Sequence, residues 1–218
     1  MIEYVNLRNF RNHEDKKFNL KEKVFIKGDN GVGKTSILEA IYFGSLLKSH
    51  RTNDDTALIM NDKPYAKIEI KTNKNLYELV ILKDRKHLSI DKVQIRKMSE
   101  FIGGYKVIIF SPEDLELIKG TPKVRRKFLD IEMFQINQDY LLTLNTYKNV
   151  LNQRNGLLKR LTLTDDLTFL HILTKKLVEE ASVIIEKRES FINELNKAFK
   201  RRFKSLNNLD EVEVVYKE

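Results

Sequence analysis

The sequence contains no cysteine, so the chain can form neither a disulfide bond nor a metal site built from thiolates. Its histidines are scattered, and their spacing fits no metal site: His13, His50, His87 and His171. No apolar run approaches the roughly 20 residues that a membrane-spanning helix needs. The N-terminus lacks the basic and then apolar pattern of a signal peptide. These absences predict a cytoplasmic protein without a membrane segment.

Prolines are scarce, and the last of the three is Pro122. No proline therefore interrupts a helix after that residue. From Ser111 to about residue 206, apolar residues recur at helical spacing in two stripes separated by a turn at residues 164–166. Ser111 is suited to cap a helix, and Pro112 suits the first position of that helix. Two long amphipathic helices joined by a short turn predict an antiparallel helical arm.

The first half of the chain shows the alternating pattern of β-strands instead. A polar run at residues 72–75 separates two of these segments and predicts a hairpin. Residues 35–47 carry apolar side chains at helical spacing and predict a helix. The expected strands lie at residues 2–8, 16–20, 23–27, 65–71, 76–82, 106–110 and, after the helices, 211–216.

The chain is basic, with a formal net charge of +9. A basic excess suggests a polyanionic partner such as nucleic acid, because each neutralised phosphate releases counterions. The alternative is that many of the lysines only solvate the surface. Charge alone does not decide between the two.

Residues 28–35 read Gly-Asp-Asn-Gly-Val-Gly-Lys-Thr and match the P-loop pattern at every fixed position. The glycines let the main-chain N–H groups turn inward toward phosphates, and the following helix adds its own unpaired N–H groups. Lys34 is expected to reach the β- and γ-phosphates of ATP, and the Thr35 hydroxyl is expected to bind Mg²⁺. The predicted nucleotide-binding residues are Gly28, Asp29, Asn30, Gly31, Val32, Gly33, Lys34, Thr35 and Ser36.

Two strands are expected before the P-loop strand, an order that is typical of ATP-binding-cassette (ABC) ATPases and their chromosome-maintenance relatives. Further blocks then narrow the match, and in their order along the chain they resemble the RecF family of bacterial recombination mediator ATPases. Besides the P-loop, these blocks are residues 7–13, 38–42, 48–52, 110–115, 118–120, 125–130 and 153–155.

The resemblance implies an α/β fold: an ABC-type P-loop head, with a mixed sheet around the P-loop helix and an inserted antiparallel helical lid or arm. It divides the chain into an ATP-binding lobe at residues 1–110, the arm at 111–206 and the start of a return strand at 207–218. It implies ATP and Mg²⁺ as ligands, ATP-dependent homodimerisation and DNA binding at single-strand gaps and stalled replication forks. It also implies cooperation with RecR and RecO in loading RecA.

Five basic residues have two interpretations each. Arg11 and Arg51 occupy positions where the resemblance implies contact with nucleotide or DNA, but both could be solvated loop charges. Arg125, Arg126 and Lys127 could touch DNA phosphates, or could form the polar face of an amphipathic helix. His50 is expected to have a structural role.

Two motifs of the family are missing. The ABC signature motif is absent, and the strand expected at residues 106–110 is followed by Ser111 instead of an acidic residue. Without that carboxylate nothing obvious orients Mg²⁺ or the attacking water, so we expect no efficient hydrolysis by this chain alone. The chain therefore reads as the N-terminal part of a longer protein.

Two other classes of function stay open. One is a different P-loop enzyme, such as an OLD-type nuclease or a small-molecule kinase, which needs a carboxylate-rich metal site or an acceptor pocket. The other is a non-enzymatic scaffold whose helical arm docks a partner, although apolar stripes of this kind more often pack on each other.

Overall fold

The computed structural model describes residues 1–162, 166–206 and 213–217. The chain divides into two compact units, Met1–Ile136 and Asn137–Glu218, and each is described by itself. Among the described residues, none of the helices is both long enough and apolar enough to cross a membrane.

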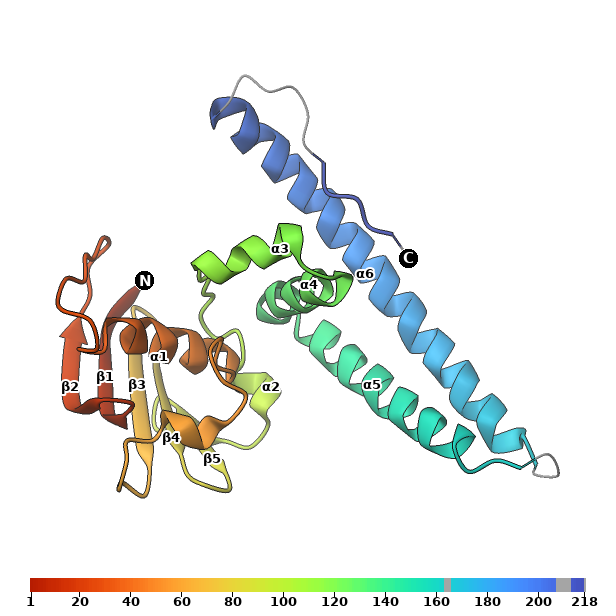
Figure 1. Cartoon of the computed structure of the whole chain (residues 1–218), viewed down its shortest axis with the longest axis horizontal. Coiled ribbons are helices and arrows are strands. Elements are labelled where there is room, and N and C mark those ends of the chain that lie inside the picture. Colours follow the sequence, from red (N-terminus) through yellow and green to blue (C-terminus); the bar gives the residue numbers. More distant parts are fainter. Residues whose placement is uncertain (163–165, 207–212, 218) are drawn as a thin grey trace. The chain divides into compact units, whose positions relative to one another are not determined.

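The first unit is built on a six-stranded sheet in the order β2-β1-β3-β4-β5-β6, and each neighbouring pair is antiparallel (Figure 1). The predicted first strand and the predicted hairpin are confirmed as β1, β3 and β4. Strands β5 and β6 escaped the sequence analysis. The strands are β1 (Ile2–Phe10), β2 (His13–Asn19), β3 (Ala66–Thr72), β4 (Leu76–Ile81), β5 (Lys86–Ile90) and β6 (Val93–Ile95).

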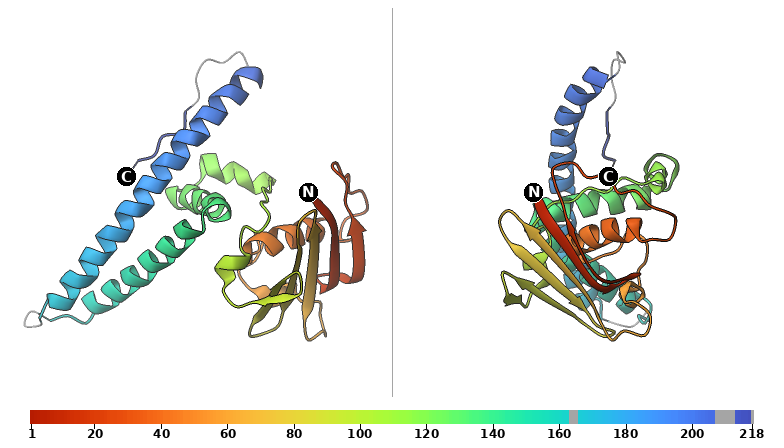
Figure 2. Two further views of the ribbon diagram at one scale, coloured as in Figure 1. Left: turned by 180° about the vertical axis from the view of Figure 1, so that it is seen from behind. Right: turned by 90° about the vertical axis from the view of Figure 1, so that its left-hand side faces the viewer.

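Helix α1 (Lys34–Leu46) lies against one face of this sheet (Figure 2). The alternation in β1, β3 and β4 places their apolar side chains on that face, where they meet apolar side chains of the helix. Each such side chain that is fully buried contributes about 1.5–3 kcal/mol to folding. The core formed in this way holds the start of α1 in place, and therefore also the end of the P-loop. The core includes Val5, Leu7, Ile37, Ala40, Phe43, Ile68, Ile70 and Leu79.

Helix α1 packs tightly against its neighbours at Gly44, where a Cβ atom would lie 2.6 Å from Ile70 Cδ1 of β3 and 2.6 Å from the Tyr105 hydroxyl oxygen. That hydroxyl donates a hydrogen bond to Ile41 O at 2.7 Å, so it is not free to move away. We expect Gly44→Ala to destabilise the chain by about 1–3 kcal/mol, because overpacking outweighs the higher helix propensity of alanine. Urea unfolding followed by circular dichroism measures this change.

Gly156→Ala is the matched control for that prediction. Gly156 also lies within a helix, but a Cβ atom there would meet nothing within 4 Å. Alanine should therefore stabilise the chain by up to about 1 kcal/mol. Equal effects of the two substitutions would contradict the close packing at Gly44.

Two of the predicted strands are wrong. Residues 23–27 and 106–110 form no strand, and Phe25 and Phe110 are 95% and 85% exposed. Their apolar pattern is that of strands, but no described strand pairs with them. Val107 instead pairs with a side chain: its N–H donates to Gln135 Oε1 at 2.7 Å, and its carbonyl accepts from Gln135 Nε2 at 2.9 Å.

The remaining elements of the first unit are short, except for the last helix. Ser111, which was predicted to cap a helix, is the N-cap of a short 3₁₀ turn, and its N–H donates to Asp114 Oδ2 at 2.6 Å. The elements are η1 (Asp55–Leu58), α2 (Met98–Phe101), η2 (Pro112–Leu115), α3 (Glu116–Lys119) and α4 (Pro122–Ile136).

The second unit consists mainly of α5 (Gln138–Leu158) and α6 (Thr168–Leu206), which pack side by side (Figure 1). The predicted pair of antiparallel helices is thus confirmed, whereas residues 111–136, which were predicted to belong to the arm, lie in the first unit. Of the predicted turn, residues 164 and 165 lie outside the described part. In the strand predicted at 211–216, residues 211 and 212 also lie outside it, and 213–217 form no strand. There Val214 pairs with the Asn196 side-chain amide at 2.8 and 2.9 Å.

Candidate nucleotide-binding site

A hollow of about 810 Å³ lies at the P-loop. It brings most of the predicted nucleotide-binding residues together with the two arginines expected to contact nucleotide or DNA. Gly28, Asp29 and Val32 belong to the loop but do not line the hollow. The lining residues are Arg11, Asn12, Asn30, Gly31, Gly33, Lys34, Thr35, Ser36, Arg51, Ala57, Ile59, Met60 and Asn61.

The P-loop turns through two glycines with left-handed backbone angles, Gly31 (φ 86°) and Gly33 (φ 96°). Helix α1 begins directly after the second of them. The Lys34 ammonium folds back over the loop and donates to Gly28 O and Asp29 O, at 2.6 Å each. An ammonium has three N–H donors, so one stays available for a phosphate oxygen.

The turn after β1 and the first residue of β2 contact the P-loop main chain. Asn12 Nδ2 donates to Gly31 O at 2.8 Å, and His13 Nε2 lies 3.1 Å from Gly33 O, within hydrogen-bonding distance. A Cβ atom on Gly33 would come within 2.5 Å of both side chains, so the loop passes against them without spare room. The sequence analysis missed this support, although Asn12 and His13 belong to one of the blocks that carried the family resemblance.

A buried ion-pair cluster holds the two arginines of the hollow. Glu39 Oε1 and Oε2 accept from Arg11 Nη2 and Nε at 2.8 and 3.0 Å. Arg51 Nη1 lies 3.5 Å from Oε2 of the same carboxylate, and Ser49 Oγ donates to Oε1 at 2.5 Å. Burial by itself would raise the pKa of Glu39, but the hydrogen bonds from Arg11 and Ser49 and the charges of both arginines outweigh it and lower that pKa. Glu39 is therefore an anion that orders its neighbours.

Comparison with known proteins places this geometry in a family. The family model described as an AAA domain matches residues 4–215. The DNA replication and repair protein RecF of Acholeplasma laidlawii is 47% identical over 201 residues, 92% of this chain and 58% of the relative. RecF of Bacillus subtilis is 42% identical over 203 residues, 90% of this chain and 55% of the relative.

The chain belongs to the RecF family. A solved structure described as the recombination mediator protein RecF with ATPγS, in the RecFOR pathway, superposes with a TM-score of 0.89 at 28% identity. The superposition covers 95% of this chain and 58% of the solved RecF chain. The predicted ABC-type P-loop head with its helical arm is thus confirmed as the fold. The chain spans about three fifths of the length of its RecF relatives.

Within this RecF fold, the three basic residues at the start of α4 do not line the hollow. Arg125 Nη1 donates to Leu117 O at 3.3 Å and to Gly120 O at 2.9 Å, which closes the end of α3. Arg126 and Lys127 are exposed. DNA contact by these residues stays a prediction. The hydrogen bonds of Arg125 also give this residue a structural role at the end of α3.

His50 lies between Ser49 and Arg51 in the loop that follows α1, but its side chain packs against another aromatic ring. Its ring meets the Tyr42 ring edge to face, with 5.4 Å between the centroids. Burial lowers the pKa of His50, and burial together with the charges of Glu132 and Asp114 raises the pKa of Tyr42 to about 12. Both rings are thus neutral near pH 7, which suits packing.

The hollow offers few ligands to a metal ion. Thr35 lines it, but no carboxylate does, and the described residues contain no cluster of three histidine or acidic side chains. Mg²⁺ in nucleotide sites takes much of its coordination from phosphate oxygens and water. The donor set therefore fits a magnesium ion that arrives with a nucleotide and takes Thr35 Oγ1 as its ligand from this chain.

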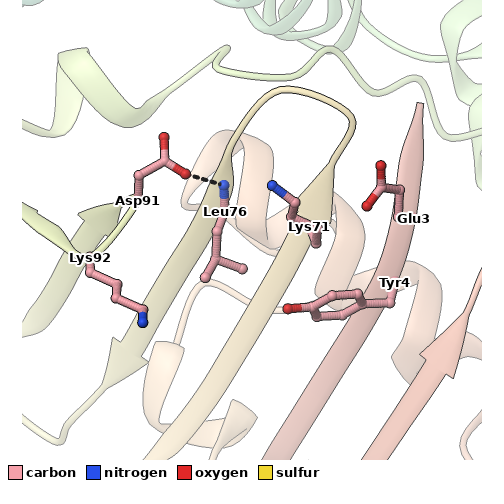
Figure 3. A pocket seen from close by; sticks show the side chains of 6 residues that line it. All are labelled: Glu3, Tyr4, Lys71, Leu76, Asp91 and Lys92. Carbon is pink, nitrogen blue, oxygen red and sulfur yellow. Dashed lines mark hydrogen bonds between the residues drawn. The ribbon is translucent and has the colours of Figure 1, made fainter.

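A second, shallower hollow of about 410 Å³ lies on the sheet, lined by Glu3, Tyr4, Lys71, Leu76, Asp91 and Lys92 (Figure 3). Two of its side chains, those of Asp91 and Tyr4, already have partners. Asp91 accepts from Leu76 N at 2.8 Å and from Asn75 Nδ2 at 2.6 Å, which fixes the ends of two hairpins. Lys17 Nζ lies 3.8 Å from the centre of the Tyr4 ring. This hollow is a surface feature of the sheet.

Proposed function

We propose that this chain is the ATP-binding part of a RecF-type DNA repair and recombination protein, and that it binds Mg²⁺-ATP in the P-loop hollow. One observation carries the proposal. Most of the P-loop, supported by Asn12 and His13, lines one hollow with Arg11 and Arg51, in a chain that superposes on a RecF bound to an ATP analogue.

Each part of the hollow suits one part of the nucleotide. The N–H groups of the glycine turn and of the start of α1 receive the phosphates, Lys34 neutralises them, and Thr35 binds Mg²⁺. The apolar side chains of Ile59 and Met60 are suited to the adenine ring. ATP with one Mg²⁺ keeps a net negative charge, which Lys34, Arg11 and Arg51 complement.

DNA and protein partners follow from the family. The relatives are described as DNA replication and repair proteins, and a solved relative as a recombination mediator of the RecFOR pathway. We accordingly propose ATP-dependent dimerisation, binding at single-strand gaps and stalled forks, and cooperation with RecO and RecR in loading RecA. The net charge of +9 favours a polyanionic partner. A cytoplasmic location stays a prediction.

The competing functions find less support. A nuclease needs several carboxylates around metal ions, and the described residues offer no such cluster. A kinase needs an acceptor pocket, and the second hollow, on the sheet, is shallow, with Asp91 and Tyr4 already partnered. In the arm, the apolar stripes of α5 and α6 pack on each other, including Leu144 and Ile184.

The test of this proposal is whether nucleotide controls DNA binding. Fluorescence anisotropy should be measured with a labelled gapped duplex and an intact duplex of equal length, with and without Mg²⁺-ATP. We expect Mg²⁺-ATP to tighten binding to the gapped duplex about tenfold, within the usual range of coupling between sites. Binding should weaken by about 10³-fold or more between 50 and 200 mM salt if six or more phosphates are contacted.

Each part of the proposal can fail separately in that experiment. Equal affinities with and without nucleotide would remove the coupling between ATP and DNA. Equal affinities for gapped and intact duplexes would remove the preference for gaps. Replacement of Mg²⁺-ATP by Mg²⁺-ADP is the control that isolates the γ-phosphate.

A further inference from the structure

Helix α1 carries a fully buried carboxylate next to the proposed phosphate site. The side chain of Glu39, five residues after Lys34, is 0% exposed. A buried charge without partners costs several kcal/mol, so its presence demands compensation from its surroundings. A negative charge at this place is also unexpected, because it opposes the binding of an anionic ligand.

The compensation comes from contacts that occupy both oxygens of the carboxylate. Oε1 accepts from Arg11 Nη2 and Ser49 Oγ, and Oε2 accepts from Arg11 Nε and faces Arg51 Nη1. The pairing with Arg11 is bidentate, the geometry that fixes a guanidinium most firmly. Ser49 Oγ in turn accepts from Arg51 N at 2.9 Å and Thr52 N at 3.2 Å.

Glu39 thereby joins three segments that are distant in sequence. They are the turn after β1, which carries Arg11, helix α1 itself, and the loop at residues 49–52, which carries Arg51. Arg11 also donates to Ala57 O at 2.8 Å. These bonds use three of the five N–H groups of Arg11, which leaves two for a ligand.

The two arginines line the hollow, whereas the carboxylate does not. We propose that Glu39 is a positioning residue for nucleotide, which holds the Arg11 and Arg51 guanidinium groups ready at the phosphate site before the nucleotide arrives. The inference rests on the proposed function, because it takes the hollow to be the ATP site. Glu39 acts through the arginines and touches no ligand itself.

The sign of one mutational effect separates positioning from plain electrostatics. Glu39→Gln removes a negative charge near the phosphates, so electrostatics alone predicts tighter ATP binding. Positioning predicts weaker binding. The amide offers one acceptor and one donor, so its NH₂ group confronts an N–H of Arg11 and the bidentate pair is lost. We expect affinity for Mg²⁺-ATP to fall about tenfold, measured by calorimetric titration of the whole chain.

Glu69→Gln is the matched control. Glu69 is another carboxylate of the first unit, partly buried, 2.6 Å from Lys67 Nζ and 2.7 Å from Asn6 Nδ2, but it does not line the hollow. This substitution removes the same charge and should leave ATP affinity within about twofold. Thermal unfolding followed by circular dichroism checks that both variants are folded.

A double-mutant cycle tests the route through Arg11. Arg11→Lys keeps the positive charge but loses the planar fork, so it should weaken ATP binding by itself. Adding Glu39→Gln to Arg11→Lys should then cost much less than the tenfold seen in the parent chain. Ser49→Ala, which leaves every charge in place, should weaken binding severalfold and serves if Glu39→Gln fails to fold.

The outcomes are distinct. If the parent chain binds Mg²⁺-ATP and Glu39→Gln binds it equally or more tightly, the positioning role is overturned and the proposed function stands. If the two substitutions in the cycle are additive, the route through Arg11 is overturned. If the parent chain binds no Mg²⁺-ATP, the proposed function falls, and the inference falls with it.

Discussion

Replacement of Lys34 by alanine should weaken Mg²⁺-ATP binding at least about 100-fold, or roughly 2.7 kcal/mol, with little loss of stability. The substitution removes an ammonium that donates to the P-loop main chain, together with the charge-assisted hydrogen bonds that it is expected to make to the phosphates. Calorimetric titration of both proteins with Mg²⁺-ATP measures the change.

The stability should hold because of what Lys34 contacts without nucleotide. Its partners, the carbonyl oxygens of Gly28 and Asp29, belong to an exposed loop. Water can replace the ammonium there, so unfolding free energy should change by no more than about 1 kcal/mol. An effect on affinity without an effect on stability assigns the loss to the site.

Lys27→Ala is the control for charge. Lys27 is exposed and directly precedes the P-loop, so its removal changes net charge by the same amount. Affinity should stay within about twofold at 0.15 M salt, where exposed charges are screened beyond about 8 Å. Undiminished binding of ATP by Lys34→Ala would refute the assignment of the hollow.

The sequence predicted those parts of the fold that local pattern determines. The hairpin of β3 and β4 follows from alternation around a polar turn, and the P-loop follows from eight consecutive residues. Strands β5 and β6 were missed because they are short and carry few apolar residues. The segments at 23–27 and 106–110 have the local pattern of strands, but a strand also needs a partner, and pairing is not a local property.

The same distinction runs through the site. Gly31, Gly33 and Lys34 could be named from a motif, because phosphate binding by main-chain N–H groups requires them close together in sequence. The pairing of Arg11 with Glu39 spans 28 residues and has no signature in the spacing. Arg125 was named for its charge, and the carbonyl oxygens that it bonds could only be found in the fold.

The placement of charge in the first unit favours the P-loop side over the open face of the sheet as the anion site. On β3 and β4, Lys67 Nζ lies 2.6 Å from Glu69 and 2.9 Å from Glu78, and on β1 and β2 Arg8 pairs with Asp15 at 2.9 Å. These basic groups are therefore neutralised by neighbours. At the hollow, by contrast, Arg11 and Arg51 share the carboxylate of Glu39, and Lys34 donates to uncharged carbonyl oxygens. Three cations thus line the hollow against one buried anion behind it, which leaves a net attraction for phosphate.

The chain should bind ATP but turn it over extremely slowly, below about 10⁻³ per second, the range of an unassisted P-loop GTPase. Hydrolysis needs a group that orients or deprotonates the attacking water, and such groups contribute about 10²–10⁴-fold. No carboxylate lines the hollow. Glu39 is buried, has both oxygens occupied and has a lowered pKa, so it is a poor base.

Single-turnover release of phosphate from radiolabelled ATP measures this rate, with Lys34→Ala as the background. Bound nucleotide recovered after about five minutes should still be mostly ATP, because a rate below about 10⁻³ per second leaves more than about 70% unhydrolysed at that time. Release near 1 per second, the lower end of ordinary enzyme turnover, would contradict the prediction. It would require a base among residues that do not line the hollow. Tight ATP binding with negligible release of phosphate would instead indicate that this chain lacks the catalytic carboxylate, and that another polypeptide segment has to supply it.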